Sequence, residues 1–301
     1  MMTGALPLWR LLALIGVTLI CFSGNSVLCR LALKQTALDA ASFTSLRLLS
    51  GALMLCLLAA CRHRMAGASP HQKHAVMPGW LGGNWLSALA LFFYAATLSF
   101  AYIDIATGAG ALLLFGAVQA TMIAAGWWAG ERLNLRQWCG FVLALAGMVA
   151  LLLPGLTAPP LSNALLMLAS GAAWGVYSLR GRSGGDPVQA SAGNFARAAL
   201  LALALNALAW SGQRWDSMGA FYALLSGAVT SGLGYAIWYT VLPSLSVTRA
   251  AALQLSVPVL ASVAGLVFVQ EAITLRLVLT SLAVLGGIAM VVLGRQLRRG
   301  H

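Results

Sequence analysis

Long apolar stretches separated by short polar links occupy nearly the whole chain. A helix needs about 20 mainly apolar residues to cross the hydrocarbon core of a bilayer. Windows of that length predict ten membrane spans, near residues 9–29, 42–61, 80–101, 106–128, 136–154, 162–181, 190–211, 217–241, 247–269 and 273–294. The runs are continuous, without the alternation of membrane β-strands. The sequence therefore predicts an all-α polytopic membrane protein.

The charge content agrees with a bilayer environment. Charged residues make up 8% of the chain and hydrophobic residues 60%, whereas soluble proteins average about 25% charged residues. The first span is longer than the apolar core of a signal peptide, about 7–15 residues, and a second span follows it. We therefore expect the first span to be retained as a helix.

Several kinds of functional motif are missing from the sequence. There is no Gly-Lys-Ser/Thr phosphate-binding loop, no serine-nucleophile elbow and no spacing of cysteines that is typical of a metal site. The five cysteines lie in or beside apolar spans, and the four histidines lie in links or at the tail. We expect no cofactor, no metal and no enzymatic activity.

The basic residues are distributed unevenly between the two sets of links. With ten spans, both termini share a side; on that side lie twelve basic residues, and only four lie in the opposite links. Cytoplasmic links are enriched in Lys and Arg. This pattern predicts cytoplasmic termini in a bacterial inner membrane. It also accounts for the net charge of +12 without a nucleic-acid partner.

The two halves of the chain resemble each other. Glu131 opens "ERLNLR" and Glu271 opens "EAITLR", 140 positions later, each between apolar runs. Arg47 in the second span and Arg197 in the seventh span also match, with a slightly different shift. The repeat predicts two units, 1–155 and 156–301. Since each unit has an odd number of spans, the second is inverted in the membrane, as in many secondary transporters.

Two inverted halves give two conformations of similar energy, each open to one side of the membrane. This arrangement favours transport by alternating access and leaves a static scaffold without a reason for the repeat. One chain holds both halves, so we expect a monomer to suffice, with a small-molecule substrate and membrane lipid as its partners.

The chain resembles the drug/metabolite transporter superfamily, in its EamA-type branch. The resemblance rests on "GERLNLRQWCGFVLALAGMVALLL", "QEAITLRLVLTSLAVLGGIAMVVL", "GYAIWYTVL", "LSVPVLASVAGLVF" and "ASGAAWGVYSLRGR". It covers nearly the whole chain and implies ten helices and solute transport. Phe22 and Ser23 replace the tryptophan-glycine pair that is usual in the first span of this family.

Ionisable residues inside a span are candidates for function. All six acidic residues lie at span ends or in links, so no buried carboxylate for proton exchange is evident. Arg47 and Arg197 lie deepest. Each is either a clamp for a carboxylate or phosphate or a side chain that extends its charge to the membrane surface. Glu131 and Glu271 are predicted to cap the helices that follow them.

Uncharged polar and aromatic residues in the middle of spans are therefore the candidate binding residues. Tyr235, Trp238 and Tyr239 share one helical face by their spacing, and so do Trp174 and Tyr177. Either these residues bind substrate or they pack helices together. The predicted binding set is Asn25, Tyr94, Trp174, Tyr177, Tyr235, Trp238, Tyr239 and Gln254, with Gly232 and Gly234 as a hinge.

An aromatic lining without charge suits a neutral or zwitterionic solute that has an apolar part. Among the branches of the superfamily, exporters of amino acids fit this lining best. The missing carboxylate favours facilitated diffusion over proton coupling. The alternative is an exporter of hydrophobic drugs or other xenobiotics.

Overall fold

The computed structural model describes residues 7–65, 82–128, 130, 134–155, 158–181, 186–245 and 253–294. All of its regular structure is helical. The helices are α1 (Leu8–Gln35), α2 (Ala40–Met65), α3 (Trp85–Ala101), α4 (Thr107–Trp128), α5 (Leu135–Leu152), α6 (Leu161–Arg180), α7 (Pro187–Leu208), η2 (Trp210–Gly212), α8 (Ser217–Leu225), η3 (Ser226–Leu233), α9 (Gly234–Val241), η4 (Leu242–Ser244), α11 (Ser256–Val269) and α12 (Leu275–Gly294).

The ten predicted spans each correspond to one helical rod in the described part of the chain, which confirms the predicted fold class. The eighth span is a single rod made of α8, the π-helical segment η3 and α9. In the ninth span, α11 begins at Ser256, Leu253 and Gln254 are also helical, and residues 246–252 lie outside the described residues. Pro258 lies in the first turn of α11, where a proline needs no hydrogen-bonded N–H.

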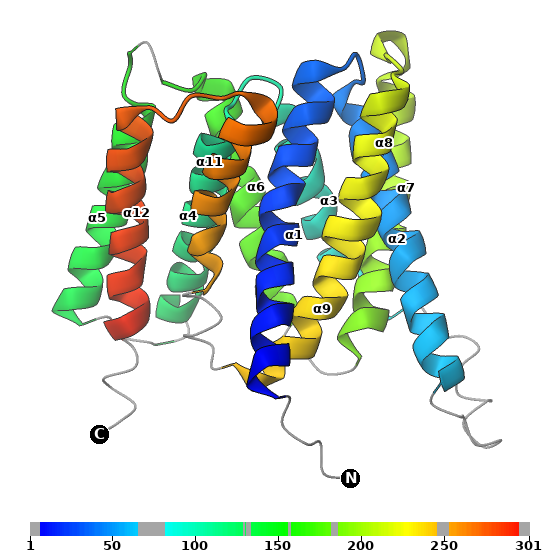
Figure 1. The fold of residues 1–301 in the computed structure, drawn as a ribbon, viewed down its shortest axis with the longest axis horizontal. Helices are drawn as coiled ribbons and strands as arrows, with labels where there is room; N and C mark the ends of the chain where they lie inside the picture. The colour runs from blue at the N-terminus through cyan, green and yellow to red at the C-terminus, as the bar shows by residue number, and fades with distance from the viewer. Residues whose placement is uncertain are drawn as a thin grey trace.

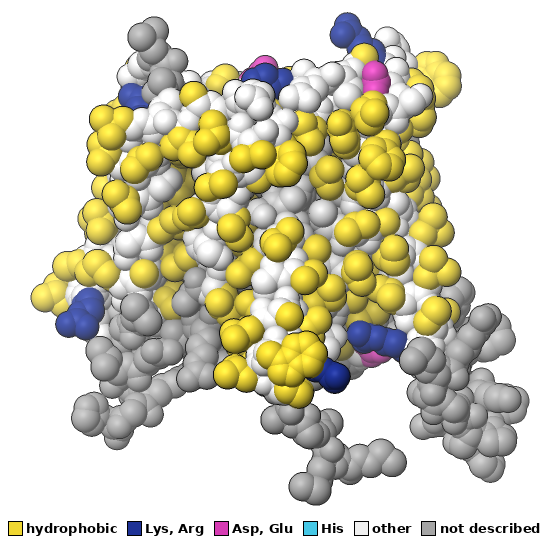
Figure 2. Space-filling model, viewed as in Figure 1, with side chains coloured by type: hydrophobic (Ala, Val, Ile, Leu, Met, Phe, Trp, Pro, Cys, Tyr) yellow, Lys and Arg dark blue, Asp and Glu magenta, His cyan; other side chains and the backbone are white. Residues whose placement is uncertain are grey.

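The outer surface of the bundle is apolar between its two ends. Within the described residues, seven helices are long and apolar enough to cross a membrane, and α3 and α11 are apolar but shorter. Figure 2 shows hydrophobic side chains over the flank, with charged side chains at the upper and lower rims. Exposed leucines such as Leu208 and Leu282 would be unfavourable in water. Lipid contact explains the belt, and the protein is an integral membrane protein.

Local sequence accounts for several helix starts. Asn134 and Gln137 form a capping box at α5, in which each side chain accepts a hydrogen bond from the other residue's backbone N–H. The side chains of Asn84, Asp186 and Asp216 accept backbone N–H groups in the first turns of α3, α7 and α8. These caps satisfy donors that would otherwise have no partner at the membrane edge.

The packing of the rods follows a repeated scheme. Helix α5 packs mainly on α12, and α2 packs mainly on α7. Helix α6 contacts α3 and α4, while α1 contacts the α8–α9 rod and α11. In Figure 1 the α5–α12 pair stands at one side, and the start of α1 and the end of α12 lie at the same, lower face. The links from α1 to α2 and from α11 to α12 lie at the opposite face.

Candidate functional site

A narrow cavity lies between helices that are far apart in the sequence. Its volume is about 20 Å³, which is enough for a water molecule but not for a metabolite. Helices α1, α3, α4, α6, η3 and α9 form its wall, through Phe22, Asn25, Ser26, Tyr94, Leu114, Phe115, Trp174, Thr230, Ser231 and Tyr235. Both halves of the chain contribute to it, so a movement of one half against the other changes its shape.

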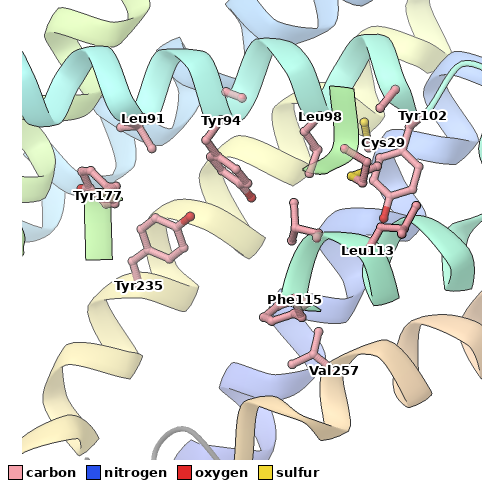
Figure 3. Close-up of a cluster of buried hydrophobic side chains, with 14 of the residues drawn as sticks. Cys29, Leu91, Tyr94, Leu98, Tyr102, Leu113, Phe115, Tyr177, Tyr235 and Val257 are labelled. Atoms are coloured by element: carbon pink, nitrogen blue, oxygen red, sulfur yellow. The ribbon is translucent and has the colours of Figure 1, made fainter. Parts of the chain in front are cut away.

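Aromatic rings make up one side of this cavity. The ring centre of Trp174 lies 4.8 Å from that of Tyr94, 5.1 Å from that of Tyr235 and 5.4 Å from that of Tyr177. Phe22 of α1 lies 5.9 Å from Tyr235 in an edge-on contact. These separations are typical of favourable aromatic pairs. Figure 3 shows Tyr94, Tyr177 and Tyr235 near one another within the buried cluster.

Asn25 is the polar centre of the opposite side. Its Nδ2 donates to the hydroxyl oxygen of Tyr94 at 3.3 Å. Its Oδ1 accepts from the hydroxyl of Ser226 at 2.7 Å, and the hydroxyl oxygen of Thr230 lies 3.5 Å from it. Asn25 is buried, so these bonds satisfy an amide that would be costly to leave unpaired. The network ties α1 to α3 and to η3.

Arg47 lies directly behind this wall. Its side chain is only 1% exposed, and α2 begins seven residues earlier, about 10 Å along the helix axis. Nη2 donates to the Tyr94 hydroxyl at 2.9 Å, and Nε donates to Ser231 Oγ at 3.5 Å. The guanidinium therefore points into the bundle, and the alternative that Arg47 extends its charge to the membrane surface is wrong.

Arg197, which matches Arg47 in the repeat, has a different environment. It is half-buried, its Nη1 donates to the carbonyl of Gly82 at 2.8 Å, and its guanidinium lies over the ring of Trp85 at 5.9 Å. These contacts lie at the start of α3, away from the cavity. The two arginines are therefore not equivalent in the structure.

The structure brings together four of the eight predicted binding residues as cavity lining: Asn25, Tyr94, Trp174 and Tyr235. Tyr177 and Trp238 form a second layer, buried against Trp174 and Phe22 respectively. Tyr239 and Gln254 are half-buried and do not line the described cavity. Whether these residues bind a substrate stays a prediction.

Sequence reasoning missed several lining residues because they carry no distinctive motif. Phe22 and Ser26 lie within one helical turn of Asn25, and Ser231 lies one turn before Tyr235. Helical spacing would have found Phe22 from Asn25 and Ser231 from Tyr235, but not Ser26, which is adjacent to Asn25 in the chain. Arg47 was considered, but nothing in the sequence indicates that α2 turns this residue toward α3 and η3.

The predicted hinge glycines lie in and directly after a π-helical segment. Segment η3 spans Ser226–Leu233 and includes Gly232, and Gly234 begins α9. A Cβ added at Gly232 would lie 2.9 Å from Cβ of Met54, and one at Gly234 would lie 2.9 Å from Cβ of Cys21. Both glycines thus allow close helix packing, and π-helical segments are frequent at functional sites.

A buried ion pair lies at the face opposite the start of α1. Arg30 Nε donates to Glu271 Oε1 at 2.8 Å, and its Nη1 donates to the carbonyl of Tyr102 at 2.8 Å. Glu271 Oε2 accepts the backbone N–H of Thr107, the first residue of α4, at 2.6 Å. The side chains are 6% and 9% exposed. The pair joins α1, the α3–α4 turn, α4 and the α11–α12 link.

The prediction that Glu271 caps the helix that follows it is wrong. Thr274 occupies the start of α12, where its hydroxyl accepts the N–H of Leu277 at 3.2 Å. The carboxylate of Glu271 instead caps α4, because Gln270 adopts a left-handed conformation (φ 60°) at the end of α11. That turn ends α11 and places Glu271 beside Thr107. Glu131 lies outside the described residues, and α5 is capped by Asn134.

Comparison with known proteins identifies the family. Residues 161–293 match the EamA-like transporter family. "Uncharacterized protein PA1977" of Pseudomonas aeruginosa is 53% identical over 299 residues, which cover 98% of this chain and 100% of that protein. The chain belongs to the EamA-like transporter family. Membership makes it a membrane transporter with a small-molecule substrate, not an enzyme, and it confirms the resemblance seen in the sequence.

A solved structure described as "Crystal structure of protein" shares the fold of this EamA-family transporter. The TM-score is 0.64 at 18% identity, and the match covers 96% of this chain and 99% of that chain. At this identity the likeness concerns the fold alone. It shows that the arrangement of helices is shared over nearly the whole chain.

Proposed function

We propose that this transporter exports small uncharged or zwitterionic metabolites, amino acids in particular, by alternating access between two inverted five-helix units, 1–155 and 156–301. The single observation that carries the proposal is the cavity itself. Its wall combines α1, α3 and α4 of the first unit with α6, η3 and α9 of the second. A site shared between two units is the place where their relative movement exposes cargo to alternate sides.

The packing scheme supports an inverted repeat. If α1 to α5 correspond to α6, α7, the α8–α9 rod, α11 and α12, then α2–α7, α4–α11 and α5–α12 are contacts between equivalent helices. The contacts of α6 with α3 and α4 match those of α1 with the α8–α9 rod and α11. Helices related by a pseudo-twofold axis in the membrane plane pack in this way.

The Arg30–Glu271 pair supports closure of one face. Arg30 is five residues beyond Asn25 in α1, so the pair lies about 7.5 Å from the cavity toward the face opposite the start of α1. It ties together four segments around that exit. We propose that this barrier must separate when cargo leaves on that side. The π-helical segment η3 and Gly232 and Gly234 would absorb the bending of the eighth span.

The nature of the wall supports the choice of cargo. Trp174, Tyr94, Tyr235 and Phe22 offer apolar area, and hydroxyls and an amide offer orientation. Such a mixture fits a small solute with a polar head and an apolar side chain. The described acidic residues all lie at helix ends, which supports facilitated diffusion from a cytoplasmic excess without proton exchange.

The test is efflux from liposomes that contain the purified protein. Vesicles are loaded with labelled phenylalanine, methionine or threonine, and efflux is measured with and without a pH gradient. Efflux of an amino acid that is insensitive to the gradient is the expected result. Release of a hydrophobic fluorescent dye, with no release of any amino acid, would favour the alternative of a drug exporter, which the aromatic wall also fits.

We further propose that the protein lies in a bacterial inner membrane with both termini in the cytoplasm. The distribution of basic residues over the whole sequence supports this orientation, with twelve on the side of the termini and four in the opposite links. Among the described residues, Arg10, Arg62, Arg136 and Arg180 are near helix ends at the face that holds the start of α1, and Arg30, Lys34, Arg214 and Arg276 are at the opposite face. Single cysteines at Arg136 and Ala272, in a cysteine-free background, would test it. An impermeant thiol reagent added to intact cells should label position 272 and spare position 136.

A further inference from the structure

Arg47 is a buried cation with unused hydrogen-bonding capacity. Its guanidinium has five N–H donors and is 1% exposed. Two contacts are made, to the Tyr94 hydroxyl and to Ser231 Oγ, while Nη1 is buried without a hydrogen-bond partner. Native proteins rarely leave such a group unsatisfied, and a charge inside a membrane span is costly enough to indicate a function.

The described carboxylates are all used elsewhere. Glu271 pairs with Arg30 and caps α4. The other four accept hydrogen bonds at helix ends, from Ser42 (Asp39), Asn163 (Asp104), Val188 (Asp186) and Gly219 (Asp216). Within the described part of the chain, the charge of Arg47 therefore has no carboxylate of the protein beside it. A bound anion that is not part of the protein would compensate the positive charge of Arg47.

Around the cavity, hydroxyl groups still have protons to donate, whereas the side-chain oxygens already accept hydrogen bonds. The oxygen of Tyr94 accepts from both Arg47 and Asn25, so its own O–H is available to donate. Ser231 Oγ accepts from Arg47, which leaves its proton available as well. The acceptor Oδ1 of Asn25 is occupied by the hydroxyl of Ser226 at 2.7 Å, whereas the hydroxyl of Thr230 gives its proton to the backbone carbonyl of Ser226 at 2.7 Å. A group that only accepts hydrogen bonds fits this pattern.

We propose that Arg47, through the Tyr94–Ser231 wall, selects cargo that carries a carboxylate, so that the substrates are amphipathic carboxylates and organic cations are rejected. The proposal rests on the proposed function, because it assigns the polar end of the cargo of the same site. Arg47 does not line the narrow cavity, so the carboxylate accepts from the hydroxyls of Tyr94 and Ser231 and meets Nη1 of Arg47 once the wall opens. The apolar part lies against Trp174 and Tyr235.

The cavity of about 20 Å³ admits no whole cargo molecule, so binding requires a more open conformation of the same wall. Opening does not remove the preference for an anion. Arg47 and Tyr94 lie on α2 and α3 of one unit, whereas Ser231 lies on η3 of the other. The Arg47–Tyr94 contact can therefore persist while the two units separate.

The experiment uses three probes that share one phenyl group and a two-carbon chain. They are 3-phenylpropionate, which has only the carboxylate, phenylalanine, which has both charged groups, and phenethylamine, which has only the amine. Equilibrium binding of each labelled probe to the full chain in lipid nanodiscs is measured in low-salt HEPES buffer free of chloride and of carboxylate anions, so that no buffer anion competes for the site. Binding is independent of turnover, so the result stands even if no amino acid is exported.

We expect 3-phenylpropionate and phenylalanine to bind at least 10-fold more tightly than phenethylamine. Hydrogen bonds to a charged group are worth about 1.5–3 kcal/mol, or about 10- to 100-fold in affinity. Arg47→Gln should therefore weaken the two carboxylates by about that factor and leave phenethylamine unchanged or improved. Arg197→Gln, the matched position in the repeat, should leave the preference intact.

Two results would overturn the inference. One is wild-type protein that binds phenethylamine as well as it binds 3-phenylpropionate. The other is an Arg47→Gln protein that elutes as a folded monodisperse species and keeps its affinity for carboxylates. If Arg47→Gln does not fold, the comparison of the three probes on the wild-type chain still decides. Amino-acid efflux that fails while 3-phenylpropionate binds would refute the proposed function and leave the anion site standing.

Discussion

The buried pair of Arg30 and Glu271 offers the sharpest test of how this transporter opens. Substitution Glu271→Gln removes the negative charge and leaves an amide oxygen that can still accept the N–H of Thr107. Arg30 keeps its bonds to backbone carbonyls but loses its only described carboxylate partner. Removal of one partner from a buried pair costs about 3–5 kcal/mol.

That cost should fall mainly on the conformation that is closed at this face, because the pair can form only when α1, α4 and the α11–α12 link are together. A loss of about 3 kcal/mol from one of two states changes their ratio by about 100-fold. The state open at the face opposite the termini should become far more populated. Release of cargo at that face should then no longer require the Arg30–Glu271 pair to separate.

Accessibility of Ser26→Cys in a cysteine-free background measures this shift. Ser26 lines the cavity, one helical turn from Arg30. An impermeant thiol reagent applied to the face opposite the termini should react at least 10-fold faster in the Glu271→Gln variant. The control is Asp104→Asn, at the same face, whose carboxylate makes a single described bond of 3.3 Å to Asn163; it should change the rate little.

A lower melting temperature without any change in the reaction rate would refute the reasoning, because the pair would then only stabilise the fold. A double-mutant cycle with Arg30→Gln gives a second check. If the two residues act as one barrier, removal of the second partner should add little to the effect of removing the first. The free-energy change between the two conformations in the double variant should then be smaller than the sum of the changes in the two single variants.

Three further predictions concern the cavity and the helices around it. Trp174→Ala removes the ring in contact with three tyrosines and should raise the half-saturation concentration of cargo about 10-fold, while Trp210→Ala, at the exposed rim, should leave it unchanged in the efflux assay. Gly232→Ala brings a Cβ to 2.9 Å from Met54; it should slow efflux and cost about 1–3 kcal/mol by overpacking, whereas Gly286→Ala, in open space, should do neither. Asn134→Ala loses the capping box of α5 and should lower stability by about 1 kcal/mol, seen as a lower melting temperature in detergent with unchanged transport.

The structure changes the expected consequence of altering the hinge. The sequence predicts a hinge at Gly232 and Gly234, and leucine at these positions would be a direct way to stiffen it. Each position faces a neighbouring helix at less than the normal contact distance for a Cβ, against Met54 and Cys21. A leucine there would disturb the packing of α2 and α1 against the eighth span, so alanine, which adds a single carbon, perturbs the fold less and is the better test of bending.

Much of the fold follows from the sequence because the solvent leaves few alternatives. In lipid, each backbone N–H and C=O must be satisfied within the chain, so an apolar run of about 20 residues becomes a helix. The predicted span near 136–154 is α5, and Asn134 caps it through a local capping box. The sequence prediction places the cap of this helix at Glu131 instead, although Asn134 and Gln137 have the spacing of a capping box.

The candidate site was predictable only in part. Tyr94, Trp174 and Tyr235 were recognised as polar or aromatic residues in mid-span, and they do meet at one cavity. Trp238 shares a face with Tyr235 but lies in the second layer, and Gln254 lies apart from the cavity lining. The sequence gives the type of each residue and its depth in a span. It does not give the rotation of each helix about its axis, which decides which residues face the cavity.

By itself, the sequence determined the membrane environment, the number of spans and the family. Only the tertiary structure decided which side chains meet. Arg30 pairs with a carboxylate 241 positions away, and Arg47 reaches a hydroxyl 184 positions away. The physical reason is that lipid gives helices no hydrophobic drive toward one another, so their faces are matched by close packing of small residues and by buried polar bonds. Those contacts depend on the shapes of two helices together, which no single stretch of the chain specifies.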